Sequence, residues 1–135
     1  MIEKEVFETS FPVRYAESDQ MGVAHHSNYI VWMEEGRSQY MRAKGLGYED
    51  IERGGAFMAV TEVNVRYVAP ARYGDHVTVR TWIDEVRSRT LSFGYELLNT
   101  ASRMLLATGR IKLIWIDRHG RVIKMPKSVR VLLPE

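Results

Sequence analysis

The segment NYIVWMEEGRSQYMRAK, residues 28–44, decides the fold because it carries the clearest helical pattern in the chain. Its apolar and small residues recur every three or four positions, while charged residues occupy the other faces, as in an amphipathic helix. Ser27 or Asn28 is suited to cap its start, and Gly45 to end it. Gly36 lies mid-helix, where glycine costs about 1 kcal/mol relative to alanine. We therefore predict a helix over Asn28–Lys44 that approaches a sheet closely at Gly36.

The segments on either side of this helix are mostly β-like. Before it, the alternation of Val6–Tyr15 predicts a strand that bends near Pro12. After it, Tyr48–Arg53 predicts a short helical or irregular piece. Turn residues then separate further predicted strands, which cover Met58–Val68, His76–Val86, Thr90–Asn99, Met104–Asp117 and Arg121–Lys124. Residues 127–133 fit a short helix or a strand equally well.

The order of these elements predicts an α+β fold. One strand and one long helix precede about four strands in a meander, and 135 residues suit a single domain spanning residues 1–135. One helix cannot cover both faces of such a sheet. An antiparallel sheet leaves its second face to water or buries it against another subunit. The pattern therefore favours a domain that dimerises.

Composition excludes several classes of protein. The hydrophobic share of 45% and charged share of 27% are those of a globular protein, and a net charge of +2 is too small to indicate a nucleic-acid binder. Because the chain has no cysteine, disulfides, thiolate nucleophiles and thiolate zinc sites are excluded. The first five residues, MIEKE, lack the apolar segment of a secretory signal, and no stretch is apolar enough to span a membrane. We expect a soluble cytoplasmic protein.

The segment YAESDQMGVAHHSN, residues 15–28, concentrates titratable side chains just before the helix. Asp19 suits a turn, and it also suits a reactive carboxylate. His25 and His26 precede the helix start, where free N–H groups and the positive dipole end favour negative charge. They either take part in a site or simply pack there. No metal or cofactor is expected, because no HExxH-type spacing accompanies the histidine pair.

The longer stretch VRYAESDQMGVAHHSNYIVWMEEGRSQYM, residues 13–41, resembles the signature of hot-dog fold acyl-CoA thioesterases. Specifically, it resembles the 4-hydroxybenzoyl-CoA thioesterase family, in the branch associated with the Tol-Pal system, whose motif is approximately R-Y-x-E-T-D-x-M-G-V-V-Y-H-x-N-Y. Ala24 stands where valine is usual, and His25 where tyrosine is usual. The resemblance implies a hot-dog fold, in which one long helix packs on a curved antiparallel sheet of five to six strands.

The resemblance also implies roles for particular residues. Asp19 would be the catalytic carboxylate, acting as a nucleophile or a general base. The N–H of His26 would bind the oxyanion, and its imidazole would orient the thioester or protonate the leaving thiolate. By its position, and not by the resemblance, Tyr15 would hold Asp19 through its hydroxyl, because it lies four residues earlier at the end of the predicted strand; otherwise it is only a packed aromatic. Glu17 and Ser18 are interpreted as loop residues. Glu34 or Glu35 is the alternative carboxylate, because another branch carries its carboxylate on the long helix.

The remaining parts of a thioesterase site are assigned from residue type. Arg87, Ser88 and Arg89 form a basic turn that would hold the coenzyme A phosphates of the substrate, unless it is only a solvated hairpin turn. Aromatic and methionine side chains would line an acyl tunnel or belong to the core, namely Tyr29, Trp32, Met33, Phe57 and Met58.

The predicted function is hydrolysis of an acyl-CoA, with a short aliphatic or aromatic acyl group, to a free acid and coenzyme A. A non-catalytic module that binds acyl-CoA or acyl-carrier protein is the alternative. A scaffold protein is a further one. A hot-dog dehydratase is disfavoured because the chain lacks a His-Phe-Pro-Gly stretch. The resemblance implies a homo-oligomer, a dimer or a tetramer of two dimers, with the site between subunits.

Overall fold

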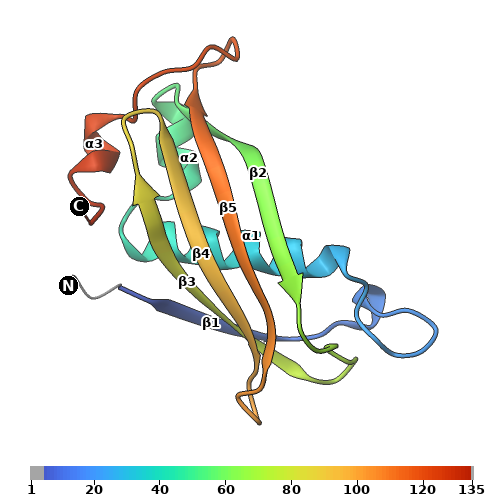
Figure 1. The fold of residues 1–135 in the computed structure, drawn as a ribbon. Helices are drawn as coiled ribbons and strands as arrows, with labels where there is room; N and C mark the ends of the chain where they lie inside the picture. Colours follow the sequence, from blue (N-terminus) through green and yellow to red (C-terminus); the bar gives the residue numbers. More distant parts are fainter. Residues whose placement is uncertain (1–4, 135) are drawn as a thin grey trace.

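The computed structural model describes residues 5–134 of the chain (Figure 1). The first four residues, part of the N-terminal segment in which no secretory signal is expected, and Glu135 lie outside the described residues. The strands are β1 (Phe7–Pro12), β2 (Phe57–Tyr67), β3 (His76–Val86), β4 (Thr90–Asn99) and β5 (Leu105–Ile116). The helices are α1 (Ser27–Ala43), α2 (Tyr48–Arg53) and α3 (Lys127–Arg130), and a 3₁₀ turn covers Tyr15–Glu17.

The predicted α+β architecture is confirmed. Five antiparallel strands form one sheet in the order β1-β3-β4-β5-β2, and α1 lies across one face of it (Figure 1). The core fills the space between α1 and the sheet, and its largest fully buried side chains include Met33, Tyr40, Phe93, Leu113 and Trp115. No helix among residues 5–134 is long and apolar enough to cross a membrane.

The predicted meander is wrong for β2. Strands β3, β4 and β5 are consecutive neighbours, but β2 pairs with β5 at the far side of the sheet instead of with β3. The pattern of residues shows which segments are strands, but it does not show which edge a strand joins. Arg121–Lys124 is not a strand either, because only one isolated bridge, between Ile116 and Val122, forms there.

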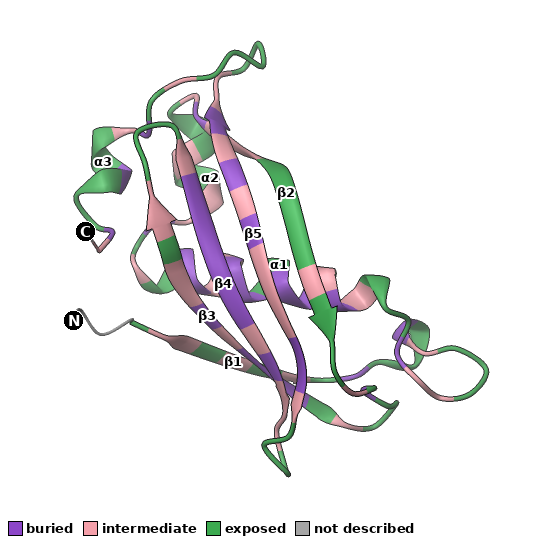
Figure 2. Ribbon diagram, viewed as in Figure 1, coloured by how far each residue is buried: buried purple, intermediate pink, exposed green. Residues whose placement is uncertain are grey.

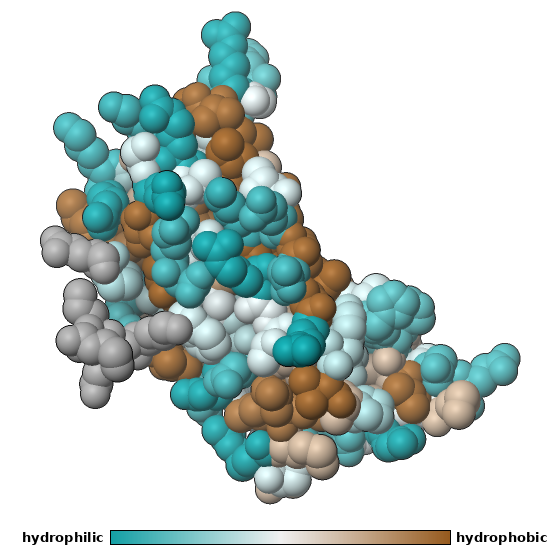
Figure 3. Space-filling model, in the orientation of Figure 1, coloured by the Kyte–Doolittle hydropathy of each residue, from teal (hydrophilic) through white to brown (hydrophobic). Residues whose placement is uncertain are grey.

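Strand β2 is an open edge of the sheet. It is mostly exposed, whereas β4 is buried along most of its length (Figure 2). The exposed large apolar side chains at this edge are Val60, Val63, Tyr67 and Val68. In Figure 3 hydrophobic residues follow this border of the sheet. An unpaired strand with apolar side chains is a template for pairing with another chain.

Gly36 brings α1 close to β3, as predicted. A Cβ atom at Gly36 would lie 2.5 Å from Thr81 Oγ1 and 2.7 Å from Val79 Cγ1. Both distances are far below ordinary contact, so even a methyl group would push the helix off the sheet. The cost of glycine in the helix is therefore offset by packing.

Gly36→Ala is expected to destabilise the protein by up to about 2 kcal/mol, because overpacking a core costs about 1–3 kcal/mol. The gain of about 1 kcal/mol that alanine brings to a helix offsets only part of this cost. Urea unfolding measures the difference. Ala43→Gly, at an exposed position of the same helix, isolates the effect of helix propensity. An increase in the free energy of unfolding of Gly36→Ala would contradict the close packing.

Candidate functional site

The loop that follows the 3₁₀ turn folds back on itself as a small hairpin. Ser18 forms a bridge with Ala24, and the N–H of Asp19 donates to the carbonyl of Val23 at 2.9 Å. Gly22 closes the turn with φ of +75°, a conformation that glycine adopts without a steric penalty. The predicted active-site loop is thus an ordered turn with Asp19 at its base.

The carboxylate of Asp19 is held through one oxygen. Its Oδ1 accepts hydrogen bonds from the N–H groups of Met21 at 2.8 Å and Val23 at 3.2 Å. Its Oδ2 has no protein partner among residues 5–134. The side chain is exposed, so the second oxygen is available to a substrate or a water molecule.

Tyr15 does not hold this carboxylate in the structure. Its side chain is 76% exposed, and its ring packs edge-on against Tyr73 with centroids 5.5 Å apart. Within residues 5–134, its hydroxyl makes no hydrogen bond to Asp19. The backbone carbonyl of Tyr15 instead accepts from the Ser18 side chain at 2.7 Å.

The start of α1 leaves one N–H group free beside this loop. Within residues 5–134, the N–H of His26 has no protein acceptor, whereas those of Asn28 and Tyr29 donate to carbonyls of the preceding turn. The expected cap by Ser27 or Asn28 is wrong: within the described residues neither side chain accepts from an N–H of α1, and the Ser27 N–H instead donates to His25 Nδ1 at 3.3 Å. Ser27 Oγ pairs with His25 Nδ1 at 2.8 Å, and Asn28 Nδ2 donates to the Glu17 carbonyl at 2.9 Å.

The two histidine rings stack on each other, with centroids 4.3 Å apart. The His26 ring also meets the Tyr67 ring edge-on, and the Tyr67 hydroxyl donates to the His26 carbonyl at 3.1 Å. A hollow of about 300 Å³ lies here; its lining comprises Ala24, His26, Tyr29, Tyr67, Val68, Ala69 and Pro70. The end of β2 and the start of α1 therefore form a mainly apolar hollow that includes the His26 ring.

Tyr29 lines this hollow and is almost completely buried. Its buried hydroxyl accepts from the Ala71 N–H at 2.8 Å and so anchors the segment that follows β2. Burial raises the pKa of Tyr29, so the hydroxyl keeps its proton. Of the other residues predicted to line an acyl tunnel, Met33 is core, while Trp32 borders a separate hollow of about 320 Å³.

Glu17, which the sequence suggested was a loop residue, is buried at the centre of the site. Only 5% of it is exposed. Its carboxylate accepts from the Trp32 indole N–H at 2.8 Å, the Arg14 N–H at 2.8 Å and the Arg14 guanidinium at 3.3 Å. Its backbone carbonyl accepts from the His25 N–H at 2.9 Å. One weak signal existed in the sequence: a buried tryptophan N–H needs an acceptor.

The hydrogen bonds to Glu17 determine its charge. Burial raises the pKa of the carboxyl, but the donors from Arg14 and Trp32 together outweigh burial and leave the pKa below its ordinary value. The stabilisation from the charged form is complete above the unfolded-state pKa of about 4.3 and disappears as pH falls through the lower folded-state value.

The stability difference between wild type and Glu17→Gln is therefore expected to depend on pH. The difference should be constant between about pH 7 and pH 5 and should shrink below about pH 4.3. The reason is that residue 17 carries a carboxylate that becomes protonated only in the wild type. Urea unfolding at several pH values measures it. A difference that stayed the same down to the acid transition would contradict an ionised Glu17.

The residues predicted to hold coenzyme A lie at the opposite end of the sheet from this loop. Arg87, Ser88 and Arg89 form the exposed turn after β3, while residues 18–24 lie near its start (Figure 1). β3 has 11 residues, so roughly 35 Å separates its ends. Arg87 pairs with Glu85 at 3.0 Å. Within one chain, the basic turn and Asp19 do not meet.

The alternative carboxylates lie on the exposed face of α1. Glu34 and Glu35 are both exposed, and Glu35 accepts from Gln39 Nε2 at 3.0 Å. Neither is hydrogen-bonded to the loop that carries Asp19. Across residues 5–134, no group of three or more metal-ligating side chains gathers in one place.

Comparison with known proteins places this geometry in a family. The profile of the thioesterase-like superfamily matches residues 13–133. A putative acyl-CoA thioesterase of Bacillus subtilis, YneP, is 40% identical over 92 residues, which cover 68% of this chain and 67% of that protein.

Two solved structures share the fold and part of the sequence. A hypothetical protein from Thermus thermophilus is 38% identical, covers 95% of each chain and superimposes with a TM-score of 0.87. A DHNA-CoA thioesterase from Staphylococcus aureus is 34% identical over 88% of this chain and 80% of that one, with a TM-score of 0.84. The chain therefore belongs to the thioesterase-like superfamily and has its hot-dog fold.

Proposed function

We propose that the protein is a cytoplasmic acyl-CoA thioesterase that hydrolyses the thioester to a free acid and coenzyme A. One observation carries the proposal: the loop bearing Asp19 is tied to the start of α1, where the His26 N–H is free. Thioester hydrolysis needs a group that attacks or activates water, and a donor for the oxyanion. Asp19 Oδ2 and the His26 N–H supply these two groups.

The proposed reaction has two possible routes at Asp19. As a nucleophile, the carboxylate attacks the thioester carbon, expels the thiolate and forms a mixed anhydride that water then opens. As a general base, it takes a proton from the water that attacks. In both routes the His26 N–H stabilises the oxyanion, and the His26 imidazole is the nearby proton donor for the leaving thiolate.

The substrate class rests on the hollow and on the relatives. A volume of about 300 Å³ lined partly by His26, Tyr29 and Tyr67 suits a short aliphatic or an aromatic acyl group. The relatives named above are a putative acyl-CoA thioesterase and a DHNA-CoA thioesterase. Within the superfamily, the motif over residues 14–29 supports the 4-hydroxybenzoyl-CoA thioesterase branch associated with the Tol-Pal system.

Thiol release from a panel of short aliphatic, long aliphatic and aromatic acyl-CoAs, followed with a thiol-reactive dye, tests this function. The protein has no cysteine, so it adds no background. Turnover of any member supports the thioesterase and ranks its substrates. Binding of acyl-CoA without turnover would instead indicate the non-catalytic module.

We further propose that a second copy pairs with β2 and completes the site. Val68 donates its N–H to the Leu106 carbonyl of β5. By the alternation of an antiparallel ladder, the peptide groups of Val63 and Val65 then point away from the sheet. They are free to pair with the same strand of a second subunit. In a dimer formed in this way the two β2 strands run in opposite directions. The partner's basic turn, residues 87–89, then lies at the end of the sheet that carries Asp19, where coenzyme A would enter.

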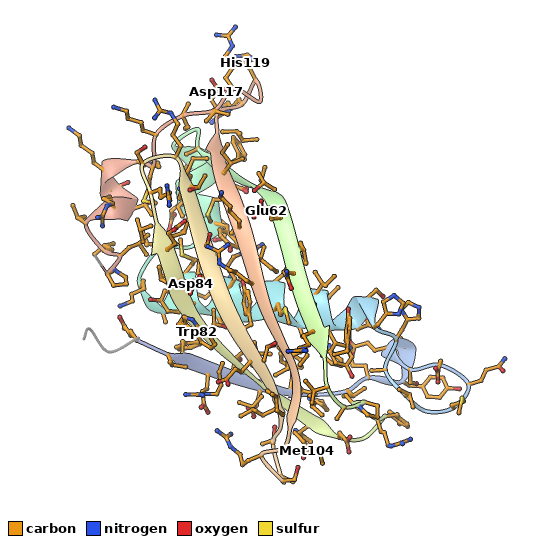
Figure 4. The ribbon with its side chains drawn as sticks, in the orientation of Figure 1. Glu62, Trp82, Asp84, Met104, Asp117 and His119 are labelled. Carbon is orange, nitrogen blue, oxygen red and sulfur yellow. The ribbon has the colours of Figure 1, made fainter. Side chains whose placement is uncertain are left out.

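Charge selects the register of this pairing. Glu62 and Arg66 are exposed on β2, and neither forms an ion pair within residues 5–134. Glu62 lies on the face of the sheet away from α1 (Figure 4). Antiparallel pairing centred on Asn64 sets Glu62 opposite the partner's Arg66, twice. Centring on Glu62 would set two like charges opposite each other, which is unfavourable.

Glu62→Arg or Arg66→Glu alone is expected to raise the dimer dissociation constant about tenfold, because each places like charges opposite each other at both pairs. The double variant should dimerise like wild type. An equimolar mixture of the two single variants should form heterodimers. Sedimentation measures dimerisation of the single variants, of the double variant and of the mixture. Glu49→Arg, at an exposed position of α2, is the control. A double variant as weak as the single ones would contradict this register.

A further inference from the structure

The loop and the helix of the proposed site meet at one buried residue. Glu17 comes two positions before Asp19, and its backbone carbonyl accepts from the His25 N–H at 2.9 Å and from Asn28 Nδ2 at 2.9 Å. Its carboxylate accepts from Trp32 Nε1, in the second turn of α1, at 2.8 Å. Three positions across the start of α1 are thus bound to this single residue.

The same carboxylate also fixes the chain that leads into the loop. The Arg14 N–H donates to its second oxygen at 2.8 Å, and the Glu17 N–H donates back to the Arg14 carbonyl at 3.0 Å. The end of β1, the 3₁₀ turn and α1 are therefore joined through Glu17. Asp19 comes two residues after Glu17. His26 directly follows His25, whose N–H donates to the Glu17 carbonyl.

We infer that Glu17 is a positioning residue, whose buried carboxylate holds Asp19 and the His26 N–H in the relative geometry that thioester hydrolysis requires. This inference rests on the proposed function. Glu17 is only 5% exposed, at the border of the separate hollow of about 320 Å³, and both of its carboxylate oxygens are already engaged by protein donors, so it is not available as the attacking group. Its effect on the reaction passes through the loop and the helix that it joins.

The charge of Glu17 matters because every group facing its carboxylate is a donor. The indole of Trp32, the N–H of Arg14 and the guanidinium of Arg14 all present hydrogens. A glutamine has nearly the same shape, but its NH₂ group would face one of these donors. The loop or the helix must then shift, and a displacement of about 1 Å costs on the order of 100-fold in rate.

Glu17→Gln is the first test, and thiol release with the best acyl-CoA of the panel measures it. The value of kcat is expected to fall about 10–100-fold while KM changes less than about twofold, since positioning acts on the reacting geometry and not on coenzyme binding. Glu49→Gln, the same exchange at an exposed position of α2, should leave both constants unchanged.

A second variant separates positioning from a general loss of structure. Trp32→Phe removes the buried donor to one carboxylate oxygen, and the Arg14 guanidinium on the same oxygen is 72% exposed and free to turn into solvent. The glutamine of Glu17→Gln/Trp32→Phe can then turn its oxygen to the Arg14 N–H and its NH₂ to the space left by the indole nitrogen. The double variant should therefore recover at least about fivefold in kcat over Glu17→Gln. Recovery of kcat by a second substitution in the core is not expected if Glu17 only stabilises the fold.

Each outcome has a defined meaning. A kcat of Glu17→Gln within about twofold of wild type overturns the inference, and so does a loss that Trp32→Phe fails to recover. Asp19→Asn is measured in parallel. If Asp19→Asn is inactive and Glu17→Gln is not, the inference alone is wrong. If Asp19→Asn is fully active, the proposed site itself is wrong.

Discussion

Asp19→Asn is expected to lower kcat by about 1,000-fold or more, because it removes either the nucleophile or the base of the proposed reaction. The loop should remain folded. Asparagine keeps an Oδ1 that accepts from the Met21 and Val23 N–H groups, the two bonds that hold the turn. Thiol release measures the loss, and binding of coenzyme A should be retained.

Asp117 provides a matched control for this substitution. Its Oδ1 accepts from the N–H groups two and four residues later, those of His119 at 2.9 Å and Arg121 at 3.0 Å, as Asp19 does from Met21 and Val23. It lies at the other end of the molecule (Figure 4). Asp117→Asn should leave turnover unchanged. Equal turnover in Asp19→Asn and wild type would make Asp19 a turn residue only and would direct attention to Glu34 or Glu35.

The elements of the fold were predictable because periodicity is local. The helix predicted over Asn28–Lys44 is observed over Ser27–Ala43, and β3 and β4 have their predicted bounds. The close approach at Gly36 followed from the cost of glycine in a helix. The position of β2 was not predictable, because joining β5 instead of β3 depends on contacts distant in sequence.

The site shows the same division between local and distant information. The turn around Asp19 and a helix starting near Asn28 follow from residue types and spacing, whereas the part given to the His26 N–H came from the family resemblance. The role of Glu17 does not, because a glutamate among polar residues normally faces water. Its burial depends on Trp32, 15 residues later, and on how α1 lies against β1. Cap formation by Ser27 or Asn28 failed for a related reason, since Asn28 donates to the Glu17 carbonyl instead.

The largest effect after that of Asp19 is expected from removing the His26 N–H. Proline has no N–H and fixes φ near −65°, and His26 has φ of −57° at the helix start, where proline is tolerated. His26→Pro therefore removes the proposed oxyanion donor without breaking α1. His26→Ala removes only the imidazole and keeps the N–H, so it is the matched comparison.

His26→Pro is expected to lower kcat about 100–1,000-fold below His26→Ala, the range measured when one oxyanion donor is lost. The kcat of His26→Ala measures the contribution of the imidazole. If its loss of kcat relative to wild type grows with the basicity of the leaving thiol, the imidazole is the proton donor to the thiolate. Circular dichroism and thermal unfolding verify that α1 persists in both variants. If the two variants hydrolyse acyl-CoA at the same rate, the oxyanion is bound elsewhere, and the helix start serves only to position the loop.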